Sequence, residues 1–154
     1  MTFPADAGLI DVTQAPYNAR GDGKMDCSEA IQQALQDHPD QNRIIYLPNG
    51  TYRISRPLRW PFATSSTQGP QRATILQGQS RDGTIIQLSD FAPGYGAIGR
   101  PRAVLWLGDE HYTHERNSVR NLSINTGTGN TGAVGIQLNT SEQGCIRQVK
   151  IVAG

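Results

Sequence analysis

The densest group of side chains that could do chemistry lies between Asp109 and Glu115, in the segment Asp-Glu-His-Tyr-Thr-His-Glu. Hydrolysis of a glycosidic bond needs two carboxyl groups, one protonated and one ionised. The candidate catalytic residues are therefore the acids of this segment, Asp109, Glu110 and Glu115. A solvated loop of charged residues would give the same pattern, so both interpretations stay open.

Two histidines of the same segment, His111 and His114, raise the question of a metal site. Their spacing is not the His-Glu-x-x-His pattern of zinc enzymes, which also requires a helix. The segment lies between expected strands, so nothing in the sequence supplies the ligand geometry. We predict no metal site here.

Aromatic residues near this segment could bind a sugar, because an aromatic ring suits the apolar face of a pyranose. Trp106 and Tyr112, together with the polar His111, are the candidate substrate-binding residues, and Trp60 is a further aromatic. Trp106 belongs to the apolar run 104–107, in which side chains of one parity must face the core. Its ring is therefore equally compatible with the interior.

The composition indicates the kind of scaffold that carries these residues. The net charge of +1 does not favour nucleic acid or an anionic membrane as a partner. No apolar run approaches the roughly 20 residues of a membrane helix, and the N-terminus has no signal-peptide pattern. Charged residues make up only 18% of the chain and glycine occurs 17 times, which is typical of a turn-rich β protein.

One helix is expected near the N-terminus, after an extended lead-in over residues 1–25. We predict it over residues 26–38, with Asp26 as N-cap and Glu29 as the capping-box acid. Apolar residues then recur at helical spacing, and Pro39 ends the pattern. Strands follow throughout 43–154, at 44–47, 51–54, 74–76, 84–88, 103–107, 119–124, 134–138 and 146–152.

An internal repeat decides how these strands are arranged. Residues 118–124 align with 145–151 at a constant offset of 27, and the alternation of apolar residues breaks at the same place in both copies. A repeated break indicates a corner in a parallel β-solenoid, with inward residues stacked in register. The predicted inward residues are Val119, Leu122, Ile124, Ile146, Val149 and Ile151, and the amides of Asn121 and Gln148 are predicted to form a ladder at the corner. A sandwich of hairpins is the alternative, but it does not account for the constant offset.

The N-terminal half resembles the opening segment of the pectate lyase superfamily. The matching residues are Gly21-Asp22-Gly23, Asp26, Ala30-Ile31-Gln32, Ala34, Ile45-Tyr46-Leu47-Pro48, Gly50 and Tyr52. The resemblance implies an all-β, single-stranded right-handed parallel β-helix, here of about four coils, with one N-terminal capping α-helix. The helix would cover the unpaired sheet edge of the first coil. Lyases, hydrolases and non-enzymes share this segment, so it does not identify an activity.

The resemblance also implies a polysaccharide partner, for a lyase or glycoside hydrolase that is secreted or held at the cell surface. None of the catalytic motifs of the polygalacturonase-like members occurs in the chain. Ca²⁺ is expected only for a pectate-lyase-type enzyme, and otherwise no cofactor. We therefore expect an N-terminal portion of such an enzyme, truncated and inactive alone, which could self-associate through an open C-terminal coil. The alternative is a non-catalytic, glycan-binding or structural solenoid of the tailspike or adhesin kind.

The two cysteines, Cys27 and Cys145, lie at opposite ends of the expected solenoid. Bridged cysteines need Cα atoms within about 7 Å. We therefore predict that both are free thiols.

Overall fold

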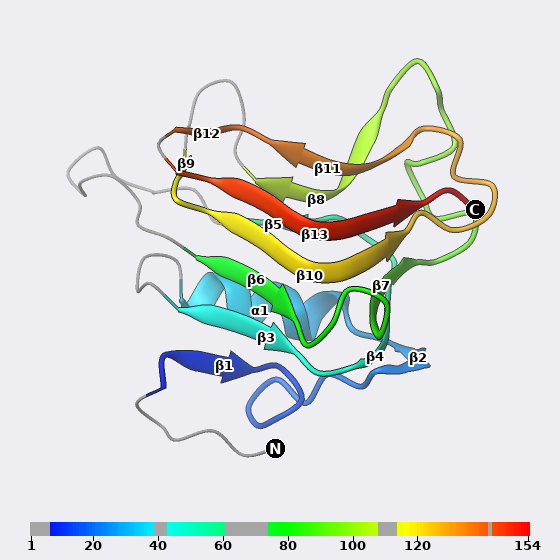
Figure 1. Ribbon diagram of the computed structural model, residues 1–154. Coiled ribbons are helices and arrows are strands. Elements are labelled where there is room, and N and C mark those ends of the chain that lie inside the picture. The colour runs from blue at the N-terminus through cyan, green and yellow to red at the C-terminus, as the bar shows by residue number, and fades with distance from the viewer. Residues whose placement is uncertain (1–6, 39–42, 61–73, 108–113, 142) are drawn as a thin grey trace.

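The computed structural model describes residues 7–38, 43–60, 74–107, 114–141 and 143–154. The chain is a right-handed parallel β-helix of about four turns with one helix. Every strand pair among the described residues is parallel, which excludes the sandwich of hairpins. In Figure 1 the strands β1, β3, β6, β10 and β13 lie one above another from the N-terminal end, with α1 behind them.

The elements repeat in a fixed order from one coil to the next. The first coil contains β1 (Leu9–Asp11), β2 (Asp22–Asp26) and α1 (Ser28–Asp37). The second contains β3 (Ile44–Leu47), β4 (Gly50–Ile54) and β5 (Leu58–Arg59), and the third β6 (Ile75–Gly78), β7 (Thr84–Leu88) and β8 (Arg102–Leu107). β9 (His114–Glu115), β10 (Ser118–Asn125) and β11 (Ala133–Leu138) follow, and then β12 (Thr140–Ser141) and β13 (Cys145–Val152).

Three faces result from this order. The first face runs β1-β3-β6 and continues into the N-terminal half of β10, while the second runs β2-β4-β7 and continues into its C-terminal half. β13 pairs with β10 along both halves. The third face is a separate sheet in the order β5-β8-β11, and β9 and β12 form a short pair of their own.

The predicted repeat and its corner are confirmed. Val119 pairs with Ile146, Leu122 with Val149 and Ile124 with Ile151. Asn121 and Gln148 both have left-handed backbones, with φ of 52° and 54°, and this conformation turns the strand at the corner.

The amide ladder predicted at this corner finds no support among the described residues, where no hydrogen bond joins the Asn121 and Gln148 side chains. The Gln148 side chain is exposed. An exposed amide already forms hydrogen bonds with water, so a bond to a second amide would add little stability there. The repeat is therefore one of backbone conformation.

The inward residues of the repeat differ in burial between the two copies. Val119, Leu122 and Ile124 are completely buried, in one core with residues from every preceding coil. Ile146 and Ile151 are 46% and 53% exposed, and Val149 is half-buried. The predicted stacking in register is confirmed, but the residues of β13 are not enclosed, because among the described residues no strand lies on its outer side.

Helix α1 occupies the place that a strand of the third face takes in later coils, and it packs against β5. Ile31, Ala34 and Leu35 are fully buried, as the helical spacing predicts. The predicted capping is wrong. The helix begins at Ser28 behind Cys27, whose side chain makes no capping bond.

Asp26 contributes to the helix start from outside it. Its carboxylate accepts hydrogen bonds from the Ser28 backbone N–H at 2.9 Å and from the Ser28 hydroxyl at 2.6 Å. Burial by itself would raise the pKa of Asp26, but hydrogen bonds from Ser28 and Ser55 outweigh it and hold that pKa below its usual range. Glu29 does not reach back to the helix start and instead pairs with Arg56.

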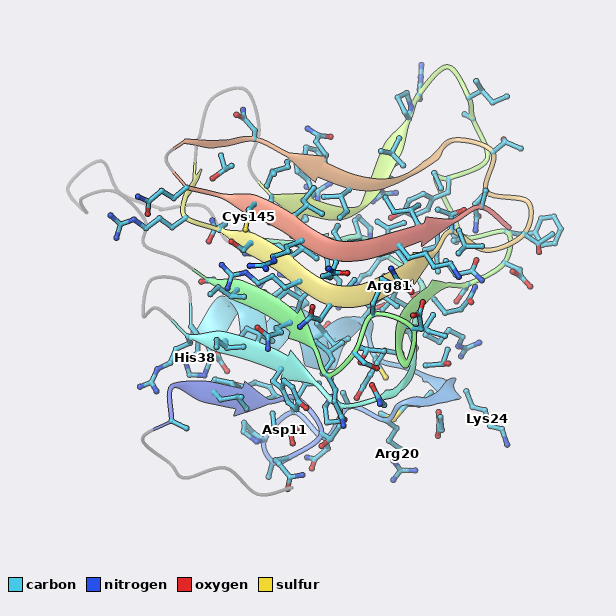
Figure 2. The ribbon with its side chains drawn as sticks, in the orientation of Figure 1. Asp11, Arg20, Lys24, His38, Arg81 and Cys145 are labelled. Carbon is cyan, nitrogen blue, oxygen red and sulfur yellow. The ribbon has the colours of Figure 1, made fainter. Side chains whose placement is uncertain are left out.

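Both cysteines are free, as predicted. Cys27 is buried beside α1, and burial raises the pKa of its thiol. Cys145 begins β13, several strands away, where Figure 2 labels it. In the described part of the chain, no helix is long and apolar enough to cross a membrane.

Candidate polysaccharide-binding cleft

The outer surface of the third face carries a row of polar and aromatic side chains. Alternation along β5, β8 and β11 turns one set inward, with Leu58 and Leu105 completely buried. Arg59 and Trp106, the residues directly after these leucines, point outward, and the register places Arg59 beside Trp106 and Trp106 beside Gln137. Strand neighbours lie about 4.8 Å apart, so this row runs along the solenoid axis.

A cleft of about 520 Å³ opens where this row meets helix α1. One side of the cleft is the outer side of α1, and the other is the start of β8 together with β5 and the residues next to it. The lining residues are Glu29, Gln32, Gln36, Arg56, Pro57, Arg59, Trp60 and Arg102. The cleft therefore exists because a helix, and not a strand, stands at the end of the third face.

The three arginines of the cleft differ in how they are held. Arg56 forms an ion pair with Glu29, and both side chains are largely exposed. The guanidinium of Arg59 lies 4.1 Å from the centre of the Trp106 ring.

Arg102 lies 5.3 Å from the centre of the Tyr95 ring and donates a hydrogen bond to the Pro93 carbonyl at 3.4 Å. Tyr95 is a rigid support, because it is fully buried and its hydroxyl donates to the Ala103 carbonyl at 3.0 Å. Burial raises the pKa of Tyr95 to about 12, so this hydroxyl stays protonated.

Among the described residues, no carboxylate pairs with Arg59 or Arg102. The aromatic rings orient both guanidinium groups without neutralising them. Stacking also restricts the side-chain rotamers before any ligand arrives, which lowers the entropic cost of binding. Within the described part of the chain, the cleft thus has two positive charges without a carboxylate partner, beside a third that Glu29 balances.

Gln32 fixes the backbone that carries Arg59. Its side-chain Nε2 donates to the Arg59 carbonyl at 2.8 Å, and its Oε1 accepts from the Arg59 N–H at 2.8 Å. This amide makes the two bonds that a neighbouring strand would make, so it satisfies the edge of β5. The expected protection of a sheet edge by the helix is confirmed for the third face.

The sequence candidates stand differently with respect to this cleft. Trp106 lies at the cleft's border, with its ring half-buried against Arg59. Glu115 belongs to β9, where its backbone pairs with Ser141. The remaining candidates, Asp109, Glu110, His111 and Tyr112, lie outside the described residues. Trp60 is only 1% exposed and its indole N–H donates to the Thr74 carbonyl at 3.5 Å, so it supports the cleft wall and offers no free ring face.

The sequence patterns did not predict Arg56, Arg59 and Gln32 as site residues. A signal for them exists, because Glu29 to Arg56 and Gln32 to Arg59 are each separated by 27 residues, the offset of the repeat at 118 and 145. Aligning the helix with the following coil at that offset would have brought these pairs together. Arg102 has no such signal, because the third coil is longer.

A second hollow of about 380 Å³ lies on the other side of α1, lined by Pro16, Tyr17, Met25, Asp26, Glu29, Ala30, Gln33 and Asp37. Its carboxylates already have partners. The Tyr17 hydroxyl donates to Asp37 at 3.0 Å, and burial followed by this bond raises the pKa of Tyr17 to about 12. Among the described residues, no group of three His, Cys, Asp or Glu side chains could hold a metal ion.

Comparison with known proteins agrees with the fold. Residues 11–153 match the family model described as rhamnogalacturonase A/epimerase, pectate lyase-like. A glucan 1,3-beta-glucosidase of Cochliobolus carbonum is 28% identical over 149 residues, which is 88% of this chain and 18% of that protein. The chain thus spans less than a fifth of the length of this curated relative.

Solved structures show the same fold at low sequence identity. ORF18 of Geobacillus virus E2 has a TM-score of 0.60 at 18% identity, over 83% of this chain and 22% of its own. The A-module of the mannuronan C-5 epimerase AlgE6 of Azotobacter vinelandii has a TM-score of 0.57 at 21% identity, over 92% of this chain and 37% of that module's chain. PfbA, a surface adhesin of Streptococcus pneumoniae, has a TM-score of 0.56 at 18% identity, over 93% of this chain and 33% of its own.

Proposed function

Because the chain belongs to the rhamnogalacturonase A/epimerase family of pectate-lyase-like proteins, we propose that it forms the N-terminal coils of an enzyme that acts on an acidic polysaccharide. The observation that carries this proposal is the cleft on the third face, with Arg59 and Arg102 both lacking a carboxylate partner among the described residues. We place the saccharide in this cleft and along the row that continues through Trp106.

The arginines support an acidic chain over a neutral one. A guanidinium binds a carboxylate through two parallel hydrogen bonds, which are stronger than bonds between neutral groups. Arg59 and Arg102 are fixed in place by stacking on Trp106 and Tyr95, so each can meet a sugar carboxylate with little loss of side-chain freedom. A neutral glucan would leave both charges without a partner.

The described part of the cleft supports binding and not bond cleavage. Glycoside hydrolysis needs two carboxyl groups, and Glu29 is the one carboxyl that lines the cleft in the part described. Glu29 is also occupied by Arg56. The described residues do not fit a calcium site either, because no group of three ligating side chains occurs among them. The candidate acids Asp109, Glu110 and Glu115 follow Trp106 along the chain, and they stay candidates for a catalytic role that would need further coils of the whole enzyme.

A polysaccharide substrate is found outside the cell, so we propose that the protein is secreted or held at the cell surface. We expect the 154 residues alone to bind without turnover. A non-catalytic, glycan-binding solenoid is the second candidate. This second candidate is favoured if a longer form of the protein with further coils also releases no products from a polysaccharide.

The test is a binding titration of the purified chain with polygalacturonate and with a neutral β-1,3-glucan. We expect the chain to bind the polyuronide and not the neutral glucan. Arg59→Gln and Arg102→Gln should each lower the affinity roughly tenfold or more, because one charge-assisted hydrogen bond contributes about 1.5–3 kcal/mol. Arg20→Gln is the matched control. Arg20 is exposed and is not among the residues that line the cleft. Equal affinity for the neutral glucan would refute the acidic substrate.

A further inference from the structure

Helix α1 closes one end of the outer surface of the third face. An α-helix with its side chains is about 10 Å across, much thicker than a strand. The core side of α1 is buried through Ile31, Ala34 and Leu35, so the remaining thickness must stand outward beside β5. The exposed Gln36 and the half-buried Gln32 lie on this outward side and line the cleft. The helix is therefore a ridge across the end of the row.

The row of outward residues leads directly to this ridge. Gln137, Trp106 and Arg59 follow one another across β11, β8 and β5, and Gln32 comes next through its bonds to the Arg59 backbone. A saccharide that lies along the row in the direction of the N-terminal coils therefore meets α1 just beyond Arg59. The bonds between Gln32 and β5 hold the ridge in place against such a ligand.

We infer that the cleft holds the end of an acidic polysaccharide chain, with the terminal sugar stopped against α1. This inference rests on the proposed function and deepens it. The carboxylate of the terminal or the adjacent sugar pairs with Arg59 or Arg102, and the amide of Gln36 is placed to bond a hydroxyl of the terminal sugar. A site in the middle of an endless groove would need the same surface to stay open past β5, where the helix stands.

The number of protein molecules that bind one chain tests the inference. Galacturonate oligomers of increasing length are titrated into the 154-residue protein by calorimetry, up to the polymer. Only one end of a chain has the right polarity to fit, so we expect one protein per chain at every length. A ratio that rises in proportion to chain length would overturn end binding, because the saccharide would then pass across the cleft, parallel to α1. That result would leave the proposed function standing, whereas no binding of any polyuronide would refute the proposed function itself.

A pair of glutamines on α1 gives a second test with a control on the same helix. Gln36 lines the cleft, whereas Gln33 points to the other hollow and bonds Asp37 at 2.6 Å. Gln36→Ala should weaken the binding of a short oligomer by roughly two- to tenfold, as expected for one neutral hydrogen bond. Gln33→Ala should leave it unchanged. If Gln36→Ala also leaves it unchanged, while thermal unfolding shows both variants folded, the terminal sugar does not lie against α1.

Discussion

Two isoleucines of one inward column offer a direct measurement of what a covering coil contributes to stability. Ile124 on β10 and Ile151 on β13 are paired in register and occupy equivalent positions in their strands. Their side chains differ in exposure, at 0% and 53%. Changing each isoleucine to alanine removes the same three carbons and causes the same loss of strand propensity. The difference between the two variants therefore isolates burial.

The magnitudes follow from the exposed fractions. Truncating isoleucine to alanine removes three carbons, or about 2.4 kcal/mol of transfer free energy when the side chain is fully buried, at about 0.8 kcal/mol per carbon. A cavity adds about 1 kcal/mol at Ile124, which is enclosed on all sides. Ile151 is roughly half-buried and opens to solvent, so its truncation should cost about 1 kcal/mol with no cavity left. We expect Ile124→Ala to be the less stable variant by roughly 2 kcal/mol, or about 4–8 °C in Tm.

Urea denaturation followed by circular dichroism gives both free energies of unfolding, and it should be repeated at several protein concentrations. Equal losses at the two positions would refute this reasoning, because Ile151 would then be covered in solution. A loss at Ile151 that grows with protein concentration would identify the cover as a second copy of the chain, the self-association expected from the sequence.

Three further outcomes can be measured on the same protein. Asn121→Ala should destabilise by about 1–2 kcal/mol because alanine is strained at a φ of 52°, whereas Asn121→Gly should be close to neutral, and a loss of equal size in both variants would point to the amide instead. Asp26 stabilises the fold above the pKa that it has in the unfolded chain, near 3.8. This contribution should disappear as the pH falls through the lowered pKa of the folded state, and Asp26→Asn should lack this acid-dependent part of the stability curve. Thiol titration in denaturant without reductant should find both Cys27 and Cys145 free, and a missing thiol would contradict the order of the coils.

The fold could be predicted from the sequence because its determinants are local or strictly periodic. Residues 118–124 and 145–151 repeat in apolar pattern, and the backbone of the two copies repeats as well, with positive φ at Asn121 and Gln148 and again at Arg116 and Gln143. The side chains of these pairs differ, so the periodicity belongs to the coil itself. The helix was predictable from spacing alone, except at its start, where Asp26 acts from the preceding strand.

The cleft was less predictable, because its parts come from coils of unequal length. Leu58 pairs with Leu105, a separation of 47 residues, while Gln32 and Arg59 are 27 apart. A loop of any length between strands changes the sequence distance but not the register, so no fixed offset connects Arg102 with Arg59. Asp109 and Glu110 were predicted as site residues because they lie in a dense cluster of polar residues in the sequence. Arg56 and Arg59 are related to α1 only by extending the offset of 27 to the first coils, and Arg102 follows no fixed offset at all.

The physical reason for the cleft is the same as the reason for the helix. A parallel solenoid has a strand edge on each face at its first coil. Here β1 and β2 are the end strands of two faces, whereas α1 covers the edge of β5 on the third. A strand would have continued the flat outer surface and left no hollow. A helix satisfies β5 through one side chain, Gln32, and its greater thickness leaves a concave angle between α1 and the sheet. Gln32→Ala should therefore both destabilise the protein, by about 1–2 kcal/mol for two lost hydrogen bonds, and weaken polyuronide binding by releasing Arg59. A variant that loses stability yet binds as tightly as the parent would show that the edge protection and the binding surface are separate.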